Sequence, residues 1–147
     1  MARKTSERQQ AILFAAVVVA AIAGLYAATQ MMEPAPVRAA VVRQVHLRID
    51  GPGWTIRYDP SATINNTAFS ILIEASRNLQ FAVSYIAYEI PKGMFVTSIN
   101  GTANGQSSGL SWQFWVNGAY GTVASDHTAL ADNDSVVWAF AASQEVG

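Results

Sequence analysis

An aromatic segment near the C-terminus carries the side chains best suited to binding a ligand or a partner. In the sequence SWQFWVNGAY, which begins at Ser111, the residues alternate as in a β-strand, so Trp112 and Phe114 share one face and Trp115 lies on the other. The Asn-Gly pair that follows predicts a tight hairpin turn, because both central residues of such a turn need a positive φ. The candidate binding residues are Trp112, Gln113, Phe114, Trp115, Asn117, Gly118 and Tyr120.

Two interpretations of this hairpin stay open. One of its two faces must contribute to a core, and the simpler interpretation places Trp112 and Phe114 there, with Trp115 partly covered. In the alternative interpretation, Trp115 and Tyr120 form a recognition surface, since aromatic side chains often anchor interfaces.

The acidic and histidine residues do not predict a metal site. Asp126, Asp132 and Asp134 lie in one region, but a calcium loop needs about six to eight oxygen ligands at regular positions, and that spacing is missing. We therefore interpret them as turn-forming carboxylates and expect no metal. His46, on a polar strand face, and His127, in a loop, have no ligand partners at suitable spacing, and we expect both to be exposed to solvent.

Several function classes lack the residues that they require. The chain has no cysteine, which excludes disulfides, thiolate metal sites and cysteine catalysis. It has no serine nucleophile elbow, phosphate-binding loop or zinc motif. From Met31 onward, six Lys or Arg residues stand against nine Asp or Glu residues, so the basic footprint of a nucleic-acid-binding protein is missing. We expect neither enzymatic activity nor a nucleic acid partner.

Three asparagine side chains are candidates for glycosylation. Asn65, Asn100 and Asn133 each begin an N-x-S/T sequence. All three fall in predicted turns, where an acceptor must be accessible. Glycosylation there also requires a host that has the machinery.

An uncharged apolar segment, residues 11–30, decides where the rest of the chain is placed. A helix of about 20 residues reaches roughly 30 Å, the thickness of a bilayer's hydrocarbon core, so we predict an uncleaved transmembrane helix. One alternative is a cleaved signal peptide, although its apolar region is usually shorter, about 7–15 residues. The other is the stem of a pilin-like filament subunit.

The segments on either side of the apolar segment predict its orientation. Residues 1–10 carry three basic residues against one acid, which favours a cytoplasmic N-terminus. Residues 31–40 contain two prolines and predict a short extended linker. Residues 41–147 then form a domain outside the cell membrane, so we expect a single-pass membrane protein with the lipid bilayer as a partner.

Small residues recur on one side of the predicted membrane helix. Ala16, Ala20, Ala23 and Gly24 are spaced so that a second helix can approach closely in lipid. We therefore expect contacts with other membrane or surface protein subunits.

The pattern of residues 41–147 predicts an α+β domain of six or seven short, mostly antiparallel strands and one helix. Helical spacing marks residues 67–77, with Asn66 or Thr67 as the N-cap and Asn78 as the C-terminal residue. Strand patterns cover residues 44–50, 54–58, 81–88, 94–99, 111–120 (a hairpin) and 135–141.

Three segments of this domain carry a family resemblance: GMFVTSINGTANG from Gly93, SWQFWVNGAYG from Ser111 and LADNDSVVWAF from Leu130. Together they resemble the domain-of-unknown-function family related to the C-terminal domain of transcobalamin and intrinsic factor. The resemblance implies a β-grasp-like fold. In the cobalamin carriers the corresponding domain closes over one face of the corrinoid, which would place Trp112, Gln113 and Phe114 near such a ligand.

The sequence as a whole favours a non-catalytic, membrane-anchored interaction protein outside the cytoplasm. We expect it to be an accessory or structural subunit of a larger membrane or cell-surface complex. The first alternative is a ligand-binding module for a corrinoid such as cobalamin, and otherwise no cofactor is expected. The second alternative is a pilin-like filament subunit.

Overall fold

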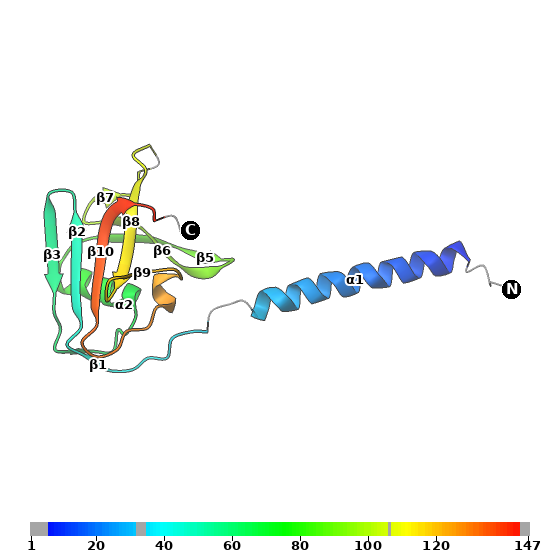
Figure 1. The fold of residues 1–147 in the computed structure, drawn as a ribbon, viewed down its shortest axis with the longest axis horizontal. Helices are drawn as coiled ribbons and strands as arrows, with labels where there is room; N and C mark the ends of the chain where they lie inside the picture. Colours follow the sequence, from blue (N-terminus) through cyan, green and yellow to red (C-terminus); the bar gives the residue numbers. More distant parts are fainter. Residues whose placement is uncertain (1–5, 32–34, 106, 145–147) are drawn as a thin grey trace. The chain divides into compact units, whose positions relative to one another are not determined.

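The chain forms two compact units, one within Met1–Pro34 and one within Ala35–Gly147. The computed structural model describes residues 6–31, 35–105 and 107–144. Figure 1 shows the first unit as a long helix and the second as twisted sheets around a short helix.

Helix α1 (Glu7–Met31) makes up the first unit. Its first turn is capped reciprocally: the amide of Gln9 donates to Ser6 Oγ at 3.4 Å, and the amide of Ser6 donates to Gln9 Oε1 at 3.3 Å. Because of this cap, the helix begins before the predicted residue 11. By length and composition, Glu7–Thr29 is apolar enough to cross a membrane.

The predicted linker, residues 31–40, is divided between the two units. Met31 belongs to α1, residues 32–34 lie outside the described residues, and residues 35–40 have no regular secondary structure. The side-chain amide of Asn66 donates to the carbonyl oxygen of Arg38 at 2.9 Å. The second half of the linker is therefore held against the domain.

A five-stranded sheet forms the larger sheet of the second unit, with strand order β3-β2-β10-β8-β9. Neighbouring strands are antiparallel except β2 and β10, which pair in parallel. Its strands are β2 (His46–Gly51), β3 (Trp54–Tyr58), β8 (Leu110–Val116), β9 (Ala119–Tyr120) and β10 (Ser135–Ala142).

The turn between β8 and β9 has the conformation that its sequence predicts. Asn117 has φ 50° and Gly118 has φ 79°, and Trp115 pairs with Tyr120 across the hairpin. Asparagine and glycine tolerate this left-handed conformation better than other residues do. The predicted Asn-Gly hairpin is confirmed.

One face of the five-stranded sheet packs against helix α2 (Ala68–Leu79). Leu47 and Ile49, which alternation places on the inner face of β2, are 1% and 0% exposed. The indole nitrogen of Trp138 in β10 donates to the carbonyl oxygen of Ala68 at 3.1 Å, which ties the sheet to the start of the helix.

Both ends of α2 are closed by caps. The amide of Ser70 donates to Thr67 Oγ1 at 2.9 Å and the amide of Thr67 donates to Ser70 Oγ at 3.0 Å, so Thr67 is the N-cap. The helix continues past Asn78, the predicted C-terminal residue, to Leu79. It ends there because Gln80 adopts a left-handed conformation, with φ 57°.

A second, three-stranded sheet has the order β5-β6-β7. Val96 and Ile99 on its inner face belong to the core, and the ring of Tyr85 contacts that of Phe69 in α2 edge-on at 4.9 Å. Its strands are β5 (Val83–Glu89), β6 (Lys92–Ile99) and β7 (Thr102–Ala103); the remaining elements are the pair β1 (Val42–Arg43) and β4 (Ala62–Thr63), and the 3-10 helix η1 (Ser125–His127).

The predicted α+β class with a mostly antiparallel arrangement is confirmed. Within the described residues there are ten strands instead of six or seven. The difference comes from β1, β4 and β7, which have two residues each and are too short to leave an alternating pattern.

Candidate functional site

The predicted binding hairpin is built largely into the core. Trp112 is 3% exposed and Phe114 is 8% exposed. The indole nitrogen of Trp112 donates to the carbonyl oxygen of Thr102 at 2.8 Å, and the ring of Phe114 lies 5.1 Å from that of Trp138. Aromatic side chains packed and hydrogen-bonded in this way stabilise a fold. Little of either ring is therefore accessible to a ligand at the surface.

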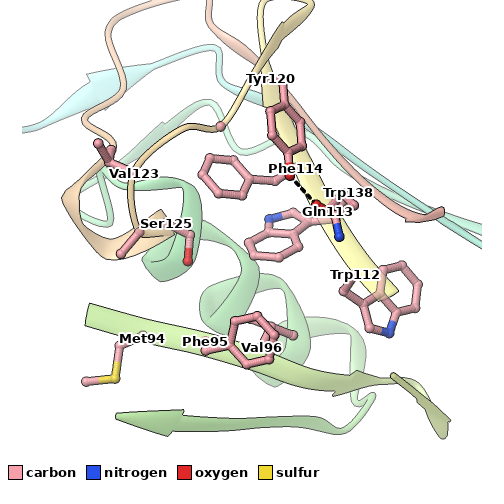
Figure 2. A pocket seen from close by; sticks show the side chains of 12 residues that line it. Met94, Phe95, Val96, Trp112, Gln113, Phe114, Tyr120, Val123, Ser125 and Trp138 are labelled. Atoms are coloured by element: carbon pink, nitrogen blue, oxygen red, sulfur yellow. Dashed lines mark hydrogen bonds between the residues drawn. The ribbon is translucent and has the colours of Figure 1, made fainter. Parts of the chain in front are cut away.

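A small cavity lies beneath the hairpin, between β6, β8 and the segment around η1 (Figure 2). Its volume is about 180 Å³. The hydroxyl of Tyr120 donates to Gln113 Oε1 at one side, and Ser125 Oγ at the other side is buried with no hydrogen-bond partner among the described residues. Small-molecule sites usually occupy about 300–1,000 Å³, so we place no cofactor here.

The end of the hairpin holds neighbouring strands together. Asn117 accepts a hydrogen bond from the amide of Ser135 at 2.9 Å and donates one to Asp134 at 2.8 Å. Trp115 and Tyr120 are half-buried and contact each other edge-on, with ring centroids 5.6 Å apart. The accessible part of the predicted site consists of the exposed Asn117 and Gly118 and the half-buried Gln113, Trp115 and Tyr120.

A larger accessible surface lies on the three-stranded sheet. It is a groove of about 760 Å³ over β5, β6, β7 and the start of β8. Three large side chains in it are exposed: Ile86 by 45%, Tyr88 by 47% and Phe95 by 44%. We call this surface the outer face and define it by Ser84, Ile86, Tyr88, Phe95, Thr97 and Leu110.

The outer face was not predicted from the sequence, although strand β5 carries a signal for it. The sequence VSYIAYE of β5 places apolar residues on both of its faces, and six of these seven residues are exposed. Among the described strands, β5 pairs with β6 alone, so it forms an edge of its sheet. Proteins normally cover or charge such an edge, which makes an uncovered apolar one a candidate contact surface.

Glu74 of α2 lies at the centre of a polar network. Its carboxylate accepts hydrogen bonds from the hydroxyl of Tyr58 at 2.7 Å, from the hydroxyl of Thr63 and from the side-chain amide of Asn65. Burial raises the pKa of Glu74, but the three hydrogen bonds outweigh burial and hold the pKa below its ordinary value. Burial and the bond to Glu74 raise the pKa of Tyr58. The network joins α2 to β3 and β4, so we assign it a structural role.

The three aspartates near the C-terminus accept hydrogen bonds from backbone amides. Asp132 accepts from Arg43 at 2.8 Å, Asp134 from Ala131 at 2.8 Å, and Asp126 from an amide of β6 at 2.9 Å. These bonds fit the turn-forming interpretation. Over residues 6–31, 35–105 and 107–144, no group of three His, Cys, Asp or Glu residues is placed to hold a metal ion.

The two histidines differ in exposure. The side chain of His46 is 57% exposed, with Nδ1 2.8 Å from Asp59 Oδ1. The prediction of a solvent-exposed His127 is wrong: its side chain is 9% exposed, because η1 packs against β6 and α2. In the part of the chain that the structure describes, neither ring nitrogen has a hydrogen bond, and Nε2 lies 3.5 Å from Asp126 Oδ2.

The three predicted glycosylation sites also differ in exposure. Asn65 is half-buried and its amide donates to Glu74. Asn100 and Asn133 are exposed and adopt left-handed turn conformations, with φ 48° and 64°. The last two have the geometry of accessible acceptors.

The small residues of α1 are exposed along one side of the helix. Ala16, Ala20, Ala23 and Gly24 follow the spacing that brings side chains onto a common face. A Cβ atom added to Gly24 would meet no described atom within 4 Å. A second helix could therefore approach here without displacing a neighbour.

Comparisons with known proteins support the fold. The family described as "Domain of unknown function (DUF4430)" matches residues 65–142, and no match to a curated protein is found. A solved protein from Ruminococcus gnavus ATCC 29149, described as a proposed metal-binding protein, is similar over 69% of this chain and 99% of its own, with 17% identity and a TM-score of 0.56. Haptocorrin in complex with Cbi is similar over 71% of this chain, with 13% identity and a TM-score of 0.55, and the match spans 26% of haptocorrin. At these identities the likeness shows a shared fold, which fits the resemblance to a domain-of-unknown-function family related to the transcobalamin domain.

Proposed function

We propose that this chain, which belongs to the DUF4430 family, is a non-catalytic, membrane-anchored protein whose extracytoplasmic domain docks onto another membrane or cell-surface protein. The observation that carries the proposal is the exposure of Ile86, Tyr88 and Phe95 together on the outer face. Removing apolar surface from water favours association by about 25 cal/mol per Å², so a contiguous surface of this kind favours a partner.

Helix α1 is the proposed anchor. Its 25 residues extend about 37 Å at 1.5 Å per residue, more than the roughly 30 Å of hydrocarbon that a helix must cross. The short basic N-terminal segment favours a cytoplasmic start, which leaves the second unit outside. A signal sequence near the N-terminus can also be a long apolar helix, so the mass of the mature chain separates an anchor from a cleaved signal.

The chemistry of the outer face indicates the kind of partner that it fits. Ile86 and Phe95 form an apolar centre, and the hydroxyls of Ser84 and Thr97 lie beside them. None of the six residues that define the outer face is charged, as in the centre of a protein interface. The free edge of β5 also offers backbone groups to which an extended segment could add as a strand. We therefore expect an uncharged, largely apolar partner surface.

Site-specific cross-linking tests the docking surface. Because the chain has no cysteine, a benzophenone maleimide can be attached to Ile86→Cys alone. Arg57→Cys, at an exposed position of β3 outside the outer face, is the control. In native membranes we expect one protein to cross-link from position 86 and not from position 57. A monodisperse monomer in mild detergent, with no cross-link from position 86, would contradict the proposal.

A matched pair of charge substitutions tests the same surface without a label. Ile86→Asp places a charge in the outer face, whereas Ile64→Asp changes a 68% exposed isoleucine that lies outside it. We expect Ile86→Asp to lose the partner on purification and Ile64→Asp to keep it. Equal recovery with both variants would show that the outer face is not the docking surface.

A corrinoid-binding module is the second candidate function. The fold is shared with haptocorrin, which was solved with Cbi, and the groove of about 760 Å³ lies within the usual range of small-molecule sites. In this candidate function the ligand would lie on the outer face, because Trp112 and Phe114 are buried. Calorimetric titration of the chain with cobalamin tests it, and absence of heat at micromolar ligand would exclude it.

A further inference from the structure

The turn that joins β5 to β6 has an unusual composition for an exposed turn. We call residues Glu89, Ile90, Pro91 and Lys92 the hairpin tip. Ile90 is 90% exposed, and its neighbour Tyr88 is 47% exposed. Turn residues are normally small or polar, because a large aliphatic side chain at such a position stays in water. The side chain of Ile90 would therefore be more stable against an apolar surface outside the domain.

An apolar hollow lies directly behind the hairpin tip. It has a volume of about 350 Å³, and its walls include Tyr88, Pro91, Met94 and Phe95. The two charged residues of the tip, Glu89 and Lys92, lie opposite each other in the strand ladder, so the tip carries no net charge. An aliphatic residue with a tyrosine and a lysine beside it is typical of segments at a membrane–water boundary.

The chain between α1 and the domain is short enough to hold the domain within reach of the membrane that α1 is proposed to span. Helix α1 ends at Met31, and the carbonyl of Arg38 is already hydrogen-bonded to Asn66 of the domain at 2.9 Å. Seven extended residues span at most about 25 Å, so Arg38 stays within about that distance of the end of α1. In the view of Figure 1, the hairpin tip and the first residues of the second unit lie at the same edge of that unit.

We infer that the hairpin tip inserts into the headgroup boundary of the bilayer, with Ile90 reaching toward the acyl chains. The inference rests on the proposed membrane anchor. Contact here is apolar and not electrostatic, because the tip is neutral and the chain from Met31 onward has more acids than bases. The tip therefore enters zwitterionic lipid, and anionic lipid adds nothing.

Fluorescence from a single label in the full chain tests the inference. Ile90→Cys carries an NBD maleimide, and the chain is reconstituted in phosphatidylcholine vesicles with or without nitroxide-labelled lipid. Ile64→Cys is the control, because Ile64 is also exposed (68%) but lies outside the hairpin formed by β5 and β6. We expect a blue-shifted emission at position 90 and quenching by the lipid nitroxide several-fold stronger than at position 64. The near-ultraviolet circular dichroism of the four tryptophans verifies that each variant is folded.

The outcomes separate failure of this inference from failure of the proposed function. If the chain does not float with the vesicles, the anchor fails, and the inference fails with it. If the chain floats but the label at position 90 stays as solvent-exposed as that at position 64, only the inference is overturned. A blue shift without quenching by lipid nitroxide would also overturn it, because protein and not lipid would then cover the tip.

A second pair of variants links the insertion to Ile90 itself. A label at Lys92→Cys reports the depth of the tip while position 90 is changed. Ile90→Asp should abolish quenching of this label, and Ile64→Asp should leave it unchanged. Unchanged quenching with Ile90→Asp would overturn the inference.

Discussion

The five-stranded and the three-stranded sheet of the second unit use similar residue types in opposite ways. In β2 of the five-stranded sheet, Leu47 and Ile49 are buried while Arg48 between them faces solvent. In β5 of the three-stranded sheet, apolar residues occupy both faces, and Ile86 and Tyr88 stay exposed. The alternation of apolar and polar residues, more than the number of apolar residues, thus distinguishes a sheet that buries its apolar side chains from one that leaves some of them exposed.

We expect the largest effect on stability from a substitution at a buried residue of the five-stranded sheet. Trp138 is 2% exposed, contacts the ring of Phe114 and donates a hydrogen bond to α2, so Trp138→Ala leaves a cavity between sheet and helix. We expect a loss of about 3–5 kcal/mol of unfolding free energy. Urea unfolding of the full chain in detergent measures it. Phe95→Ala, on the outer face, should cost less than about 1 kcal/mol, and equal losses would contradict the division between the sheets.

A glycine beside the same core tests how closely it is packed. A Cβ atom at Gly121 would collide with the ring of Phe114, so we expect Gly121→Ala to cost about 1–3 kcal/mol. The same unfolding experiment measures it. In a Phe114→Leu background the cost should shrink, because the smaller side chain makes room. An unchanged cost in that background would mean that the clash is not with Phe114.

The Glu74 network should have a smaller effect, and one that depends on pH. Glu74→Gln keeps the shape of the side chain but removes its charge, at an expected cost of about 1 kcal/mol near pH 7. Because hydrogen bonds lower the pKa of Glu74 from its ordinary value of 4.5, the carboxylate stabilises the fold above that value, and the stabilisation is lost as pH falls through the lowered pKa.

Unfolding of both forms at about pH 6 and about pH 3 measures this difference. The native chain should lose more stability on acidification than Glu74→Gln does. Equal losses of stability in the two proteins would show that groups other than Glu74 cause the acid sensitivity.

The smallest expected effect on stability is on the outer face. Ile86→Ser removes a side chain that is 45% exposed, so the unfolding free energy should change by less than about 0.5 kcal/mol. The same variant should weaken recovery of the proposed partner. A loss of stability as large as that of a core variant would show that Ile86 supports the fold.

Local patterns were sufficient to predict much of this fold. Alternation located β2 and β3, and the positive φ needed in a tight turn located the hairpin at Asn117. The parallel pairing of β2 with β10 could not be predicted in this way, because it joins segments almost 90 residues apart. The end of α2 was also missed, since Gln80 and not Asn78 adopts the left-handed conformation that closes it.

Burial of individual side chains was harder to predict than secondary structure. His127 is covered because η1 packs on β6, a contact that depends on the tertiary fold. For Trp112 and Phe114, by contrast, the simpler interpretation of the hairpin placed both residues in the core, where the structure has them. The sequence of β5 did carry a usable signal, because its apolar residues lie on both faces of the strand. Only one face of this edge strand packs toward the core, so apolar residues on the other face stay exposed.

The parallel pairing of β2 and β10 has a mechanical consequence. Strand β2, which lies early in the domain, and β10, the last described strand, run side by side in the same direction, from Ser135 opposite His46 to Ala139 opposite Asp50. A tensile load applied between the two ends of the domain would pull these strands lengthwise past each other. The hydrogen bonds between β2 and β10 would then bear the load in shear. All of them would share the force, instead of breaking one at a time from one end.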